Sequence, residues 1–258
     1  MTVTLLLPRL VLLCVLLADN CFAFPFIPSR LKTRSLSVSL MQDPSVRSGE
    51  DPTSLDNNID IMLLTETWLR PAADEAKIAD LAPPGYSVLS FPRSSGGPSV
   101  KGGGIAFVLR DSLKQHVSST SSFPVQHPCF EAAQLTLTYS KQLTNFFCIY
   151  RPPPSKKNNF TDSMFFDQFS DFLEHSDSLP GKTLLMGDFN FHFENLENNN
   201  SRKLHDIIYI FNLTQSVTEP THNQGHLLDL VLSKQSDNIM DSHLTTQLCY
   251  ASLMYLYP

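Results

Sequence analysis

Cysteine is scarce and irregularly spaced in this chain of 258 residues. Its five cysteines, at positions 14, 21, 129, 148 and 249, form no Cys-x-x-Cys pair. The spacing therefore matches neither a zinc-binding pattern nor a disulfide framework, and the cysteines are predicted to be thiols of the core. A Walker-type phosphate loop is also absent, because Lys101 precedes the glycines at 102–104 instead of following a glycine-rich run.

Positive charge is in short supply. Lysine and arginine total 19 against 25 acidic residues, which gives a formal net charge of −6. Proteins that hold nucleic acid through bulk electrostatics are usually basic, so any contact with nucleic acid must be local or assisted by a metal ion. A hydrophobic content of 42% and an aromatic content of 10% are sufficient for one large folded domain.

No hydrophobic run is long enough to span a bilayer, because Asp19 and Asn20 end the apolar block at 10–17. We therefore expect no stable association with membranes. Arg9 precedes this block and Cys21-Phe22-Ala23 follows it, so residues 1–23 are predicted to be a secretory signal peptide. Residues 24–54 are rich in serine and basic residues and are predicted to be a disordered linker, with a mitochondrial transit segment as the alternative.

The remaining chain alternates short apolar runs with a few helical patterns. Strands are predicted at 59–64, 86–91, 105–109, 131–138, 145–150, 183–186 and 227–232, and helices at 74–81, 164–175 and 201–211. Many strands with few helices between them indicate an α/β (α+β) domain of packed sheets flanked by helices, over residues 55–234. Residues 235–258 form a divergent tail.

The run at 184–186 ends abruptly in Gly187-Asp188-Phe189-Asn190. If the strand continues, Asp188 and Asn190 project from the same side, because side chains alternate along a strand. A carboxylate could then activate a water while a carboxamide donates a hydrogen bond to a phosphate oxygen. The alternative is an ordinary turn after a strand, where Asp and Asn are also frequent.

Three further polar side chains interrupt or end apolar runs. Glu66 follows a predominantly apolar strand and is predicted to be a ligand for a hard cation such as Mg²⁺, or else a cap of the next helix. Tyr150 could donate to a phosphate oxygen or pack on the prolines that follow it. Asp229 lies within an apolar run and requires a partner, which in hydrolytic sites is usually a histidine. His222 and His226 are predicted to be loop residues without other metal ligands near them.

Five motifs occur together in this order. They are Thr65-Glu66-Thr67-Trp68-Leu69, Gly102-Gly103-Gly104-Ile105-Ala106, Ile149-Tyr150-Arg151-Pro152-Pro153, Gly187-Asp188-Phe189-Asn190, and Pro220-Thr221-His222 with Leu228-Asp229-Leu230-Val231. The set resembles the endonuclease/exonuclease/phosphatase superfamily and is most similar to the endonuclease domain of LINE-type retrotransposons. The resemblance covers residues 55–234.

The resemblance implies a four-layered sandwich of two β-sheets with helices outside. It also implies Mg²⁺-dependent cleavage of a phosphodiester, with Mn²⁺ as an alternative ion and DNA as the substrate. By motif, Glu66 would bind the metal and Asp188 would position the attacking water. Asn190 and Tyr150 would contact the scissile phosphate, and Asp229 would orient a catalytic histidine.

Two parts of the family pattern differ here. Members of the family begin with a strand that ends in asparagine, a position that residues 1–54 occupy in this chain. Members end with Ser-Asp-His, whereas this chain has Asp241-Ser242-His243. We therefore expect sheets that lack edge strands, and two alternatives stay open: an inactive, truncated remnant of the domain, or a secreted phosphodiesterase of the same superfamily. The leader predicts secretion, while the resemblance implies a nuclear protein.

Overall fold

The computed structural model describes residues 60–69, 78, 82, 84–93, 102–123, 129–155, 158–222 and 224–237. It also gives the backbone of four short strands at 9–13, 34–41, 245–246 and 249–250. The helix expected at 74–81 falls largely outside the described residues, although Ile78 is helical. Among the helices within these ranges, none has the length and apolar character needed to cross a membrane.

A six-stranded sheet carries most of the candidate residues. Its strands lie in the order β10, β11, β9, β8, β7, β6. Their bounds are β6 Val117–Ser122, β7 Glu131–Tyr139, β8 Gln142–Tyr150, β9 Lys182–Asp188, β10 Leu213–Gln215 and β11 Asp229–Lys234. Strands β8 and β9 pair in parallel, and helix α2 (Asp162–Ser178) makes the crossover that a parallel pair requires.

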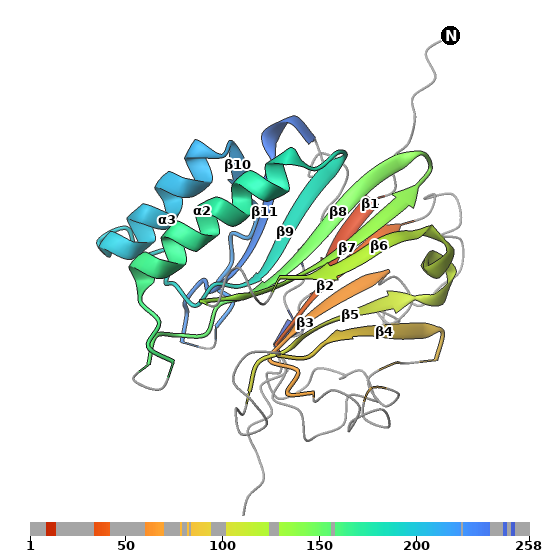
Figure 1. Ribbon diagram of the computed structural model, residues 1–258, viewed down its shortest axis with the longest axis horizontal. Helices are drawn as coiled ribbons and strands as arrows, with labels where there is room; N and C mark the ends of the chain where they lie inside the picture. The colour runs from red at the N-terminus through yellow and green to blue at the C-terminus, as the bar shows by residue number, and fades with distance from the viewer. Residues whose placement is uncertain are drawn as a thin grey trace, which may run out of the picture.

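The second sheet has the order β12, β1, β2, β3, β5, β4, with β13 paired to β2. The bounds are β1 Arg9–Leu13, β2 Arg34–Met41, β3 Ile61–Thr65, β4 Tyr86–Phe91, β5 Ile105–Arg110, β12 Thr245–Thr246 and β13 Cys249–Tyr250. Short 3₁₀ helices η3 (Asp111–His116) and η4 (Gln235–Asp237) follow β5 and β11. Figure 1 shows the two sheets face to face, with α2 and α3 (Asn199–Ile210) over the outer face of the six-stranded sheet.

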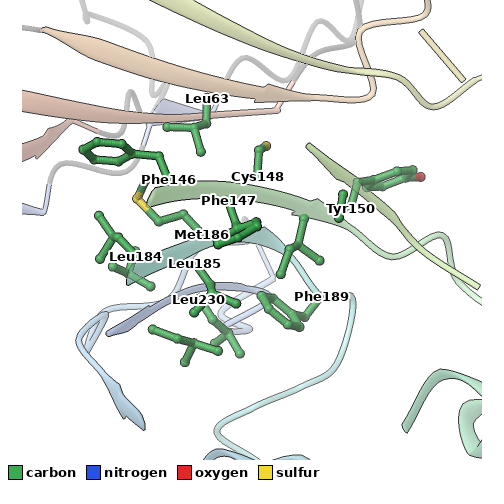
Figure 2. Close-up of a cluster of buried hydrophobic side chains, with 14 of the residues drawn as sticks. Leu63, Phe146, Phe147, Cys148, Tyr150, Leu184, Leu185, Met186, Phe189 and Leu230 are labelled. Carbon is green, nitrogen blue, oxygen red and sulfur yellow. The ribbon is translucent and has the colours of Figure 1, made fainter. Parts of the chain in front are cut away.

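Strand β8 packs against a different layer on each face. Leu63 of β3 lies on the same side of β8 as Phe146 and Cys148 (Figure 2), and the Cys148 sulfur is 3.9 Å from the carbonyl oxygen of Leu64. On the opposite face the Phe147 ring lies 5.3 Å from Phe172 of α2. Because alternate residues of β8 face alternate layers, this strand is the centre of the core.

The helix predicted at 164–175 is part of α2, and a stripe of aromatic residues on it forms the face that contacts the sheet. The buried rings of this helix are Phe165, Phe166, Phe169 and Phe172. Burial of each such ring contributes roughly 2 kcal/mol relative to exposure. The helix begins after Thr161, whose side chain accepts a hydrogen bond from the backbone N–H of Met164 at 3.2 Å. The cap and the apolar stripe together fix α2 over β8 and β9.

The predicted α+β class and the pair of packed sheets are confirmed. Two strands were not predicted from the sequence: β6, whose residues are mostly exposed and polar, and the three-residue strand β10.

Strand β2 lies within 24–54, where the sequence predicts a linker, and it pairs with β3. Strand β3 therefore does not lie at the edge of its sheet. This differs from the prediction that the edge strand on this side is missing. Residues 35–40 alternate serine with leucine or valine, a strand pattern that the serine-rich composition hid. The boundaries of the four segments predicted from the sequence, at 1–23, 24–54, 55–234 and 235–258, stay predictions.

Candidate active site

A row of polar side chains crosses one end of the six-stranded sheet. In the strand register Glu131 pairs with Tyr150, Tyr150 with Asp188, and Asp188 with Asp229. Residues paired directly across neighbouring strands project from the same face of a sheet. This face is turned toward the second sheet, because Cys148, two residues before Tyr150, contacts β3. Residues that the sequence places far apart are thus neighbours in space.

Glu66 joins this row from the second sheet. It directly follows β3, and its backbone has φ +54°, in the left-handed region that non-glycine residues rarely occupy. The Tyr150 hydroxyl donates a hydrogen bond to Glu66 Oε1 across 84 positions of sequence. Figure 2 shows Tyr150 at the end of β8 with its hydroxyl pointing away from the apolar cluster. The end of β3 and the end of β8 therefore meet at one place.

Glu131 and Arg93 belong to the same group of side chains, and sequence reasoning missed both. Glu131 accepts hydrogen bonds from Arg93 Nε and from the backbone N–H of Gly104, each at 2.6 Å. The Arg93 guanidinium also lies 5.9 Å from the centre of the Tyr150 ring. Burial raises the pKa of Glu131, and the charge of Arg93 partly opposes this. Glu131 opens an alternating strand, and no local signal separates it from an ordinary exposed residue.

Burial and charge keep Tyr150 protonated. Burial is the largest cause of a strongly raised pKa of the phenol, and the carboxylates of Glu66 and Asp188 raise it further. A phenol in this environment does not ionise at physiological pH. Tyr150 is therefore a permanent hydrogen-bond donor that sits between two carboxylates.

Asp188 ends β9, and Asn190 lies outside the strand. The Asp188 side chain is 1% exposed, and its Oδ1 accepts a hydrogen bond from the backbone N–H of Asn190 at 3.0 Å. Asn190 has φ +51°, and its side-chain amide donates to the carbonyl oxygen of Arg151 at 2.8 Å. The prediction that strand alternation aligns these two side chains is wrong, because the chain turns directly after Asp188.

Arg151 holds this turn in place. It is 2% exposed, and its Nη1 donates to the carbonyl oxygens of Phe189 and Asn190, each at 3.2 Å. Its Nη2 forms an ion pair with Asp162 in the first turn of α2, and the guanidinium lies 3.8 Å from the centre of the Phe191 ring. Burial lowers the pKa of Arg151, while Asp162 opposes the shift. The planar guanidinium thus fixes the backbone that follows Asp188.

We expect Arg151→Lys to lower the free energy of unfolding by about 2 kcal/mol, because an ammonium cannot serve two carbonyls and a carboxylate in one plane. Urea unfolding followed by circular dichroism measures the change. Arg202→Lys is the matched control, since Arg202 is exposed and bonds only to Asn199 of its own helix among the contacts described. Equal midpoints for the two variants would show that the fork geometry of Arg151 is unimportant.

Asp229 opens β11 and is held by a buried threonine. The Oγ1 atom of Thr221 accepts hydrogen bonds from the backbone N–H groups of Leu228 and Asp229 at 2.8 and 2.9 Å. The predicted histidine partner of Asp229 is not tested, because His243 lies outside the described residues. His226 lies in a loop, as predicted, but the prediction that it has no other metal ligands near it is wrong. Its ring lies beside His192 and Glu194, close enough for the three to share a metal ion.

The side chains at the row fit a hard divalent cation. Glu66, Asp188 and Asp229 offer only carboxylate oxygens, which are the ligands that Mg²⁺ and Mn²⁺ prefer. The charge of Glu66 raises the pKa of Glu131, and the charges of Glu66 and Asp188 both raise that of Tyr150. Burial is the main cause of both shifts, and the added effect of Glu66 and Asp188 on Tyr150 means that their carboxylates lie close to the phenol. A bound cation would offset the repulsion between these charges. Glu66 directly follows β3, so its carboxylate reaches this group from the opposite sheet.

The chain is similar to several solved structures. A 3′ phosphatase from Neisseria, NExo, bound to a product DNA hairpin, is 15% identical with a TM-score of 0.50, over 71% of this chain and 79% of that one. The human Nocturnin catalytic domain is 14% identical with a TM-score of 0.48, over 69% and 70%. An endonuclease/exonuclease/phosphatase family protein from Leptotrichia buccalis is 14% identical with a TM-score of 0.39, over 58% of this chain and 59% of its own length.

No curated protein sequence matches the chain. The family model described as "Endonuclease/Exonuclease/phosphatase family" matches residues 39–238, which is most of the 258 residues. Both sheets, α2, α3 and every member of the polar row contribute residues to this span. The chain belongs to the endonuclease/exonuclease/phosphatase family.

Proposed function

We propose that this protein hydrolyses phosphodiester bonds in DNA with Mg²⁺, as a retrotransposon-type endonuclease. The observation that carries the proposal is the polar row itself: Tyr150, Asp188 and Asp229 in one strand register, with Glu66 bonded to Tyr150 from the other sheet. Family membership supports metal-dependent hydrolysis of phosphate esters. The choice of DNA rests on the motif resemblance and on a related fold that holds a DNA hairpin.

Each side chain has a role that its surroundings support. Glu66 would hold the ion, and Asp188 would accept a proton from the attacking water. The Asp188 carboxylate is fixed by the Asn190 N–H and by the backbone that Arg151 holds. When bound, the ion stabilises negative charge on the phosphate and on the departing oxygen.

The remaining residues would bind and orient. Tyr150 remains protonated and would donate to a phosphate oxygen in place of Glu66, once the ion engages that carboxylate. The Asn190 amide lies at the same turn and would donate to the phosphate after leaving the Arg151 carbonyl. Asp229, held at the strand end by Thr221, would orient a histidine.

Supercoiled plasmid tests the activity directly. Tag-free protein is expected to convert it to the nicked form with Mg²⁺, and chelation with EDTA should stop the reaction. Cleavage that continues in EDTA would contradict the role of the metal. Absence of cleavage of DNA by the folded protein would overturn the proposed function.

Glu66→Gln is expected to raise the Mg²⁺ concentration for half-maximal nicking by about tenfold or more, because the amide keeps the size of the side chain but loses its charge. A titration of the initial rate against Mg²⁺ measures the shift. Glu174→Gln is the control, since Glu174 is an exposed residue of α2. A parallel shift in both variants would exclude Glu66 as the ligand.

A further inference from the structure

A second group of metal-binding side chains lies next to the row but is not part of it. His192, Glu194 and His226 each offer one ligand atom, and these atoms all lie within 4.8 Å of one another. The two histidine rings stack with centres 3.7 Å apart and an angle of 15° between planes. Glu194 Oε1 lies 2.8 Å from His226 Nδ1. Within the described residues, no other three His, Cys, Asp or Glu side chains bring their ligand atoms this close together. The carboxylates of the row are farther apart, so an ion there would take one or two of them and complete its coordination with water.

Backbone hydrogen bonds hold the three residues together. His192 and Glu194 follow β9, and His226 comes shortly before β11. The two segments are joined by the Phe193 N–H to the Leu227 carbonyl at 3.1 Å, and by the Leu227 N–H to Glu194 Oε2 at 2.9 Å. The carbonyl oxygen of His192 also accepts from Ser201 Oγ at 2.8 Å. The backbone of the two segments is therefore fixed, and binding of an ion would require only that the two stacked imidazole rings turn so that their nitrogens converge.

The charge state of Glu194 suits a ligand. Its partial burial raises the pKa, but hydrogen bonds from the Leu227 N–H and from His226 outweigh this and leave the pKa below its usual value. The carboxylate is thus ionised at neutral pH. His192 and Glu194 are exposed and His226 is half-buried, so an ion from solution can reach all three.

We propose that His192, Glu194 and His226 form a zinc site. Two imidazoles and one carboxylate are a ligand set that borderline transition metals favour, whereas Mg²⁺ selects oxygen ligands alone. Three protein ligands leave a fourth tetrahedral position for water or another ligand. This site therefore differs in metal preference from the all-oxygen group at Glu66, although both lie at the same end of the sheets.

The proposed zinc site lies between the two loops that adjoin Asp188 and Asp229. His192 is four positions after Asp188 and His226 is three before Asp229. A bound ion would cross-link the loop that leaves β9 to the loop that enters β11. Since an ion that binds only the folded protein stabilises it, zinc would strengthen the two strand ends that carry the carboxylates of the row.

Titration of the tag-free, chelator-stripped chain with ZnCl₂ alone tests the proposal. Isothermal titration calorimetry should give one tight site per chain, and Co²⁺ in its place should give the visible absorption of a nitrogen-coordinated site. We expect Zn²⁺ to raise Tm by several degrees. Mg²⁺ at the same concentration should do neither at this site.

Two variants and one control complete the test. His192→Ala and Glu194→Gln should each weaken zinc binding by at least about tenfold and remove the Tm increase. The amide oxygen that Glu194→Gln introduces would still accept from the Leu227 N–H, so the loops should remain folded. His175→Ala is the control, because His175 is an exposed residue near the far end of α2. The proposal is wrong if wild type binds zinc no more tightly than His192→Ala. Zinc binding is measured without any nuclease assay, so this result and the outcome of the plasmid assay are independent.

Discussion

Asp188→Asn is expected to slow Mg²⁺-dependent nicking by about a thousandfold or more without lowering Tm. Asp188 occupies the middle of the polar row, between Tyr150 on β8 and Asp229 on β11. An asparagine has nearly the same shape, and its oxygen can still accept the hydrogen bond from the Asn190 N–H. It carries no negative charge and cannot take a proton from water, so only the chemistry is removed.

The rate of conversion from supercoiled to nicked plasmid measures this effect. Asp171→Asn is the matched control, because Asp171 is an exposed residue of α2 and should leave the rate at the wild-type value. Thermal unfolding of the three proteins confirms that any loss is not a loss of fold. If Asp188→Asn cleaves as fast as wild type, the proposed role of the row in catalysis is refuted.

Gly187→Ala is expected to lower the free energy of unfolding by about 3 kcal/mol or more. Gly187 has φ +153°, and a Cβ added there would lie 1.8 Å from the carbonyl oxygen of Ile149 on the paired strand β8. The obstacle is backbone, so no side-chain rotation can relieve it, and β8 and β9 must separate. These strands carry Tyr150 and Asp188, so the variant should also lose nicking activity.

Gly85→Ala is the control that distinguishes the steric clash expected at Gly187 from the strain of a positive φ alone. Gly85 has φ +85°, and a Cβ added there meets no atom within 4 Å. We expect a cost of about 1 kcal/mol from strain alone. Urea midpoints of the two variants give the difference. Similar midpoints would mean that β8 and β9 do not approach as closely as described at Gly187.

Local sequence patterns were sufficient to predict the helices and strands of the domain core. The phenylalanines of α2 recur at helical spacing, and β8 and β9 are short apolar runs with clear ends, so each is visible in a window of a few residues. Strand β2 was missed because its alternating pattern lies in a serine-rich segment. Strand β10 is too short to show a period, and its place depends on pairing with β11.

The sequence by itself determined four of the residues in the row. Glu66, Tyr150, Asp188 and Asp229 each end or interrupt an apolar run, and a charge or hydroxyl at such a place requires a partner whatever the fold. It also determined the family, through five motifs in order.

Only the tertiary structure decided which side chains meet. Glu131 reaches Tyr150 through strand register, and Arg93 reaches Glu131 from a separate loop. His192 and His226 stack because the loops beside β9 and β11 run side by side. Register and loop packing are set by contacts between distant parts of the chain, and no short stretch of sequence encodes them.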